Sequence, residues 1–117
     1  SKSLFPTEQV SLIIMFQKHS IELLKGEYEV LDEVAILFNE ENSTQKTKII
    51  LKIRLCQEEK EKDKFLGIKR AKIVRDYLIL EKNINPNYIL ILDYDTYDYF
   101  PKKGCEDEGI RIHFVKG

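Results

Sequence analysis

The chain has 117 residues and a mass of 13.8 kDa, which predicts one domain, because single domains usually contain roughly 100–200 residues. Hydrophobic residues make up 43% and charged residues 33% of the sequence, a globular balance that excludes a disordered chain and a membrane bundle. With 19 basic and 20 acidic residues the formal net charge is -1, so the sequence gives no support to a general nucleic-acid binder.

The motifs of common catalytic, cofactor and metal sites are missing from the sequence. Two cysteines are too few for a disulfide scaffold or a four-cysteine zinc site, and His19 and His113 stand far apart. Asp93, Asp95 and Asp98 lack the spacing of a calcium-binding EF-hand loop. There is no GxGxxG, no GxxxxGK[ST] and no HExxH. We therefore expect no cofactor, no metal and no enzymatic activity.

The sequence has no stretch that approaches the ~20 continuous apolar residues of a membrane span. We expect no signal peptide at Ser1, because the first residues lack the basic start and the about 7–15 apolar residues of such a segment. Two interpretations stay open at this point: a cytosolic protein, or a piece of a longer exported protein.

The first half of the chain predicts a strand, a helix and a second strand. Residues 10–16 are apolar and partly β-branched, which is typical of a short buried strand. Apolar residues recur at helical spacing in an amphipathic helix over residues 27–39. Residues 46–56 alternate between apolar and basic from Ile49 onward, which is the clearest strand pattern in the chain.

A run of charges and a second long helix follow. Residues 57–64 read QEEKEKDK, and such a run is usually a solvated loop or the start of a helix. The helical period then returns over residues 65–81. Asn83 suits the left-handed position that ends a helix, and Pro86 supports the stop because proline cannot continue a helix.

The last part of the chain predicts two strands, over residues 88–92 and 110–115, separated by a long polar loop over residues 93–109. The order β-α-β-α-β-β favours parallel pairing through crossovers, while the last strand has no preceding helix and is expected to run antiparallel. The predicted fold class is α+β: a mixed four-stranded sheet with the helices packed on one face, and residues 1–117 as a single domain.

Three segments resemble the OmpA-like C-terminal domain family, the OmpA/MotB fold that binds peptidoglycan. Residues 66–85 read LGIKRAKIVRDYLILEKNIN and are similar to the family pattern LSxxRAxxVxxYLxxxGI, with Arg70 and Ala71 at the arginine and alanine. Residues 15–38 resemble the family's first strand, its loop and its LDxVAxxL helix, and residues 109–115 resemble its NRRVEF strand. The resemblance covers nearly the whole chain.

Two motifs of the family are altered here. Where the family has GHTD after the second strand, this chain has LCQE. Glu58 takes the place of the binding aspartate if the alignment includes a gap, and without the gap the position falls on Leu55. At the NRR motif Gly109 and Ile110 replace the asparagine and the first arginine, whereas Arg111 matches the second.

The resemblance implies a site for the free end of diaminopimelate in the peptidoglycan stem peptide, which carries an ammonium and a carboxylate. By resemblance Arg70 clasps the carboxylate, because a planar guanidinium donates two parallel hydrogen bonds. Glu58 is the candidate acceptor for the amine, and Arg111 is a further candidate ligand residue for which a structural role is the alternative.

Two arrangements of Arg70 remain open. In a retained site the guanidinium lies exposed beside the loop that follows Cys56, with an acid across the gap. In a degenerate site a neighbouring carboxylate of this chain, Glu59 or Asp63, holds Arg70 instead.

Two features of the polar loop bear on partners and compartment. The segment from Asp93 to Pro101 contains three tyrosines and a phenylalanine, so it is either a surface for an envelope protein partner or a cover for the sheet edge. Cys56 and Cys105 could pair as a disulfide if the domain is exported, or remain unpaired.

The resemblance implies a non-catalytic periplasmic domain that anchors an outer-membrane or other envelope protein to peptidoglycan. The rest of that protein would carry a lipid anchor, a barrel or a transmembrane helix. Loss of the acid–amine contact predicts weak binding, because a charge-assisted hydrogen bond contributes about 1.5–3 kcal/mol, or about ten- to a hundredfold in affinity. The alternative is a degenerate module that serves protein–protein assembly in an envelope, secretion or motility complex.

Overall fold

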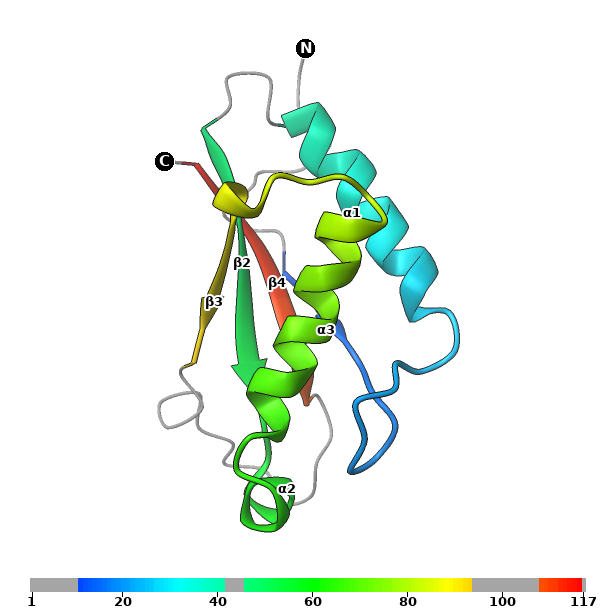
Figure 1. Cartoon of the computed structure of the whole chain (residues 1–117), viewed down its shortest axis with the longest axis vertical. Coiled ribbons are helices and arrows are strands. Elements are labelled where there is room, and N and C mark those ends of the chain that lie inside the picture. Colours follow the sequence, from blue (N-terminus) through cyan, green and yellow to red (C-terminus); the bar gives the residue numbers. More distant parts are fainter. Residues whose placement is uncertain (1–10, 42–45, 94–107, 117) are drawn as a thin grey trace.

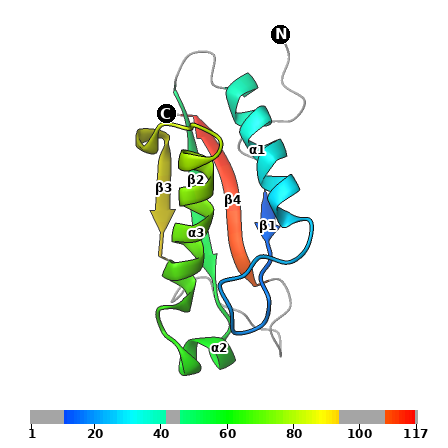
Figure 2. The same cartoon turned by 45° about the vertical axis from the view of Figure 1, so that its right-hand side comes forward.

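The computed structural model describes residues 11–41, 46–93 and 108–116. Four strands form one sheet, and helices α1 and α3 cover one of its faces (Figure 1, Figure 2). The elements in chain order are β1 (Leu12–Ile14), α1 (Glu27–Glu41), β2 (Thr47–Arg54), α2 (Gln57–Lys62), α3 (Leu66–Leu80), a 3-10 turn η2 (Pro86–Tyr88), β3 (Ile89–Leu92) and β4 (Gly109–Lys116).

The sheet is mixed, with the strand order β1-β4-β2-β3. Strands β2 and β3 are parallel, as expected for strands joined by a helical crossover. Strand β4 lies between β1 and β2 and runs antiparallel to both, so that Ile112 pairs with Leu12 on one side and with Leu51 on the other. The predicted α+β class, the mixed sheet and the antiparallel last strand are confirmed.

A local sequence feature sets the end of α3, whereas the bounds of α2 and β1 differ from their sequence patterns. Asn83 has a φ of 59°, so it adopts the left-handed conformation predicted for the residue that ends the second long helix. The charge run after β2 forms the short helix α2 rather than a loop. Strand β1 is shorter than the apolar stretch around it and covers only Leu12–Ile14.

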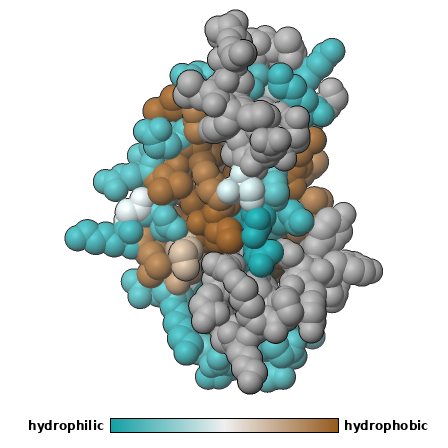
Figure 3. All heavy atoms as spheres, turned by 180° about the vertical axis from the view of Figure 1, so that it is seen from behind, coloured by the Kyte–Doolittle hydropathy of each residue, from teal (hydrophilic) through white to brown (hydrophobic). Residues whose placement is uncertain are grey.

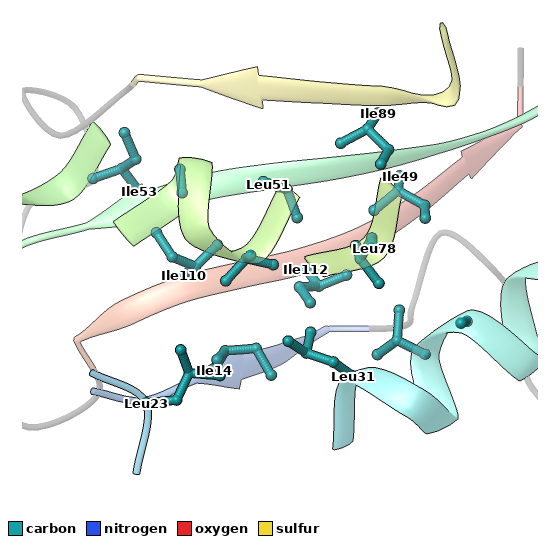
Figure 4. Close-up of a cluster of buried hydrophobic side chains, with 14 of the residues drawn as sticks. Ile14, Leu23, Leu31, Ile49, Leu51, Ile53, Leu78, Ile89, Ile110 and Ile112 are labelled. Atoms are coloured by element: carbon teal, nitrogen blue, oxygen red, sulfur yellow. The ribbon is translucent and has the colours of Figure 1, made fainter. Parts of the chain in front are cut away.

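The core lies between the sheet and the two long helices (Figure 4). Alternate residues of β2 point into it, because successive side chains of a strand point to opposite faces. The helix α1 buries one apolar stripe against the sheet. The main buried side chains are Leu31, Val34, Phe38, Ile49, Leu51, Ile53, Val74, Leu78, Ile110, Ile112 and Phe114.

Helix α3 packs closely against β2 through two small residues. A Cβ added at Gly67 would lie 2.4 Å from Cγ2 of Ile53, a distance that requires the Ile53 side chain or its surroundings to shift. Ala71, one turn further along, is fully buried. Arg70 lies between these two residues in sequence, so the close approach of α3 places Arg70 near the end of β2.

In the part of the chain that the structure describes, the opposite face of the sheet carries no helix, and apolar side chains gather on it (Figure 3). Leu90 of β3 and Val115 of β4 are 48% and 43% exposed. Within the described residues no helix is both long and apolar enough to cross a membrane.

Candidate functional site

Arg70 of α3 is buried, with 1% of its side chain exposed. Its guanidinium lies over the ring of Phe16, 5.0 Å from the ring centroid. Nε donates a hydrogen bond to the Ser20 carbonyl at 2.8 Å, and Nη2 donates to the Gln17 carbonyl at 3.2 Å. The arginine head is therefore enclosed by the chain itself.

Among the described residues, two carboxylates pair with Arg70. Nη2 lies 2.9 Å from Oε1 of Glu59, whose side chain is fully buried. Nη1 lies 3.5 Å from Oε1 of Glu108, which is also buried. Glu59 comes from α2 and Glu108 from the residue before β4, so three separate segments meet at one guanidinium. Of the two arrangements predicted for Arg70, the one in which a neighbouring carboxylate holds it is observed, with Glu59.

Other groups complete the shell of these two acids. Glu108 Oε2 accepts a hydrogen bond from the Cys56 amide at 2.8 Å. Glu59 Oε2 accepts from the backbone amide of His19 at 2.6 Å and lies 3.1 Å from the Nδ1 atom of the same residue. We define the buried cluster as Glu59, Arg70 and Glu108.

The cluster holds the turn between β1 and α1. Arg70 binds two carbonyls of residues 17–20, and Glu59 binds an amide of the same turn. His19 has a φ of 58°, a left-handed conformation that is uncommon for a residue with a side chain and needs support from its surroundings. The contacts with the cluster provide this support.

The two carboxyl groups of the cluster differ in their affinity for protons. Burial is the main cause that raises the pKa of Glu108 to about 7. A hydrogen bond from the Cys56 amide lowers this pKa, and the neighbouring Glu59 raises it further. Burial also acts to raise the pKa of Glu59, but hydrogen bonds from Glu108 and His19 and the charge of Arg70 together lower it. Near neutral pH Glu59 is therefore the ionised partner of Arg70, and Glu108 is close to its midpoint.

The other residues predicted for the site lie elsewhere. Glu58 is half exposed, and its Oε2 lies 3.9 Å from Lys18 Nζ and 4.0 Å from His19 Nε2. Arg111 donates from Nη1 to the Ser11 hydroxyl at 2.7 Å. Because its neighbours in β4, Ile110 and Ile112, point into the core, Arg111 points to the opposite face of the sheet from α3. The structure thus does not bring Arg111 and Arg70 together.

The cysteines and the aromatic segment are only partly described. Cys56 is disulfide-bonded. Cys105 is the only other cysteine in the sequence and lies outside the described residues. The predicted partner surface between Asp93 and Pro101 also lies outside them, apart from Asp93. In the described parts of the chain no group of three or more His, Cys, Asp and Glu side chains is arranged to hold a metal ion.

Sequence reasoning identified Arg70 but not its full environment. The sequence offers Glu59 as only one of two possible neighbours of Arg70, and no pattern in it points to Glu108. Glu59 belongs to a charge run, whose members are usually solvated. Glu108 follows a long loop, so its proximity to Arg70 depends on where β4 enters the sheet. The rule that long charged residues are rarely buried unless they are paired applies to both acids once the fold is known.

Comparison with known proteins identifies the fold. No family model and no curated protein matches the sequence. Among solved structures, an outer membrane protein from Borrelia burgdorferi B31 has 22% identity and a TM-score of 0.57, over 91% of this chain and 85% of the other. The periplasmic domain of Helicobacter pylori MotB has 16% identity and a TM-score of 0.66, over 92% of this chain and 81% of the other. The chain therefore has an OmpA/MotB-like fold.

Proposed function

We propose that this chain is a non-catalytic domain of the cell envelope, located in the periplasm as part of a longer exported or membrane-anchored protein. Its fold resembles those of an outer membrane protein and of a periplasmic domain. The disulfide at Cys56 supports the same compartment, because disulfides persist in the periplasm and are rare in the cytosol.

Within this role, the geometry best supports a domain that has lost the diaminopimelate contact of Arg70. The observation that carries this proposal is the burial of the guanidinium against Glu59, at 2.9 Å and with 1% of the arginine exposed. Breaking a buried ion pair costs about 3–5 kcal/mol. A new charge-assisted hydrogen bond to a ligand carboxylate returns about 1.5–3 kcal/mol. The exchange is unfavourable, so wall binding through Arg70 is weak or absent.

A weakened peptidoglycan site is the second candidate. Its support is the segment around Arg70, which keeps the family pattern, together with the exposed Glu58 beside Lys18. In this version the turn over residues 17–20 moves away, Arg70 becomes accessible to the stem-peptide carboxylate, and Glu58 accepts from the amine. Binding then includes the free energy of opening the turn.

A role in protein–protein assembly is consistent with the surface. Leu90 and Val115, paired with Ile50 and Lys48 of β2, expose apolar side chains on the face of the sheet opposite the described helices. Exposed apolar patches of this kind mark interaction sites. The segment over residues 93–101 remains a second proposed contact with an envelope partner, because tyrosines combine an apolar body with a polar tip.

Sedimentation with purified diaminopimelate-containing sacculi tests the proposal. The oxidised domain should stay in the supernatant, while an established wall-binding domain, run in parallel, should sediment. Retention of this domain on sacculi, with release by free diaminopimelate, would support the second candidate and contradict the first. Retention that free diaminopimelate does not release would point to a wall contact elsewhere on the domain.

A further inference from the structure

The buried cluster contains two carboxyl groups and one guanidinium, so its charges do not balance when both acids are ionised. Arg70 is 2.9 Å from Glu59 and 3.5 Å from Glu108, and all three side chains are buried. Like charges in a buried site disfavour double ionisation, and one of the two acids then keeps a proton. The proton stays on Glu108, because each acid affects the other's pKa: Glu59 raises the pKa of Glu108, and Glu108 lowers the pKa of Glu59.

We propose that the buried cluster is a proton-sensitive clamp on the turn over residues 17–20, closed while Glu59 and Glu108 share one proton and loosened when that proton is lost. In the closed state Glu59 is free to accept from the His19 amide and to pair with Arg70, and Arg70 donates to the carbonyls of Gln17 and Ser20. Loss of the proton places a second negative charge beside Glu59 and draws the guanidinium toward Glu108. Both changes weaken the bonds that hold the turn.

The groups that face Glu108 determine where this change occurs. Among the described residues they are Glu59 of α2, Arg70 of α3 and the Cys56 amide. His19 reaches the cluster through Glu59, and Lys18 and Glu58 lie outside it at exposed positions. Burial dominates among these influences and raises the pKa of Glu108 to about 7, within the range of environmental pH.

The sign of the effect follows from linkage. A carboxyl whose pKa is raised in the folded state stabilises that state while it is protonated, and this contribution is lost as the pH rises from the unfolded value toward the folded one. For Glu108 this stabilising contribution is lost over the pH range from 4.5 to about 7. The turn should therefore be most strongly held in mild acid and least strongly held above neutral pH.

Hydrogen exchange of the His19 amide in the intact, oxidised domain measures the clamp directly, because this amide donates to Glu59. After correction for the intrinsic rate, its protection should fall about tenfold or more between about pH 5 and pH 8, as expected for at least one unit of pKa shift. Glu108→Gln should remove the fall, because the amide side chain can still donate to Glu59 but cannot ionise.

His19→Asn is the matched control, because it removes the imidazole while asparagine still accepts a left-handed backbone. This variant should keep the pH-dependent fall in protection at residue 19. An unchanged fall in Glu108→Gln, no fall in the wild type, or loss of the fall in His19→Asn would each overturn the proposal.

Carboxyl NMR of the wild type gives a second test that does not depend on the folding of a variant. One glutamate carboxyl should titrate with a midpoint near 7, which Glu108 supplies. Titration of every glutamate below about pH 5, as for unperturbed carboxyls, would contradict a shared proton.

Discussion

The burial of Arg70 predicts a large loss of stability when its charge is removed. Arg70→Ala would leave Glu59 buried without its cation at 2.9 Å, and would remove the side-chain donor to the carbonyls of Gln17 and Ser20, of which the Gln17 carbonyl keeps the Ser20 amide. Removing one partner of a buried ion pair costs about 3–5 kcal/mol. This is a large fraction of the roughly 5–15 kcal/mol that stabilises a typical domain.

Urea unfolding followed by circular dichroism measures this loss, and the same helix supplies a control. Arg75 of α3 is 37% exposed and pairs with the neighbouring Asp76 at 3.4 Å. Arg75→Ala should change the free energy of unfolding by less than about 1 kcal/mol, because exposed ion pairs contribute little. If Arg70→Ala is no more harmful than Arg75→Ala, Arg70 is a solvated residue and the described cluster is wrong.

A double variant separates the ion pair from packing. Arg70→Met combined with Glu59→Leu should cost less than the sum of the two single changes, because replacing both members of a buried pair with apolar residues removes the uncompensated charge. The coupling free energy should be about 0.5–3 kcal/mol, the range for residues in contact. Additive effects would indicate that the two side chains do not interact.

Three further predictions concern packing and titration. Ala71→Leu should lower the free energy of unfolding by about 1–3 kcal/mol, because it overpacks a fully buried contact with the sheet. Lys72→Leu, at the next and exposed position, should not lower it. An unchanged melting temperature for Ala71→Leu would show that Ala71 faces water. A hydrogen bond to Asp32 at 2.6 Å is the main cause that raises the pKa of Tyr77 to about 12. In an ultraviolet titration, Asp32→Asn should lower this pKa toward the ordinary value of 10.0. A midpoint that stays at about 12 would exclude the hydrogen bond as the cause. The wild type should lose stability as the pH falls below 4.5, because the pKa of Glu59 is lowered in the folded state. Glu59→Gln should lack the part of this loss that comes from protonating Glu59. The same dependence of the free energy of unfolding on pH in both proteins would contradict this prediction.

The fold was predictable because its main features depend on local patterns. The alternation around Ile49 defines β2, and Asn83 ends the second long helix in the left-handed conformation that was predicted. Strand β1 was predicted too long because an apolar composition does not reveal where pairing with β4 stops. Helix α2 was not distinguished from a loop because its sequence is almost entirely charged and its one buried residue, Glu59, faces a partner from α3.

The site was less predictable because its contacts join distant segments. The family resemblance selected Arg70 and the exposed Glu58, since these were the positions that matched or nearly matched a motif. Which acid reaches Arg70 depends on how α2 turns at the end of β2 and on where the chain enters β4. Sequence patterns contain neither piece of information, so Glu108 could be recognised only in three dimensions.

The central claim is that Arg70 is used within the domain and is not available to a ligand carboxylate. The most direct measurement is the NMR resonance of the Arg70 Nε–H group, which donates to Ser20, during titration with a diaminopimelate-containing muropeptide. The resonance should stay unchanged up to about 1 mM, a concentration at which a binding free energy of only about -4 kcal/mol would be visible. A saturable shift that free diaminopimelate suppresses would contradict the account and assign wall binding to Arg70.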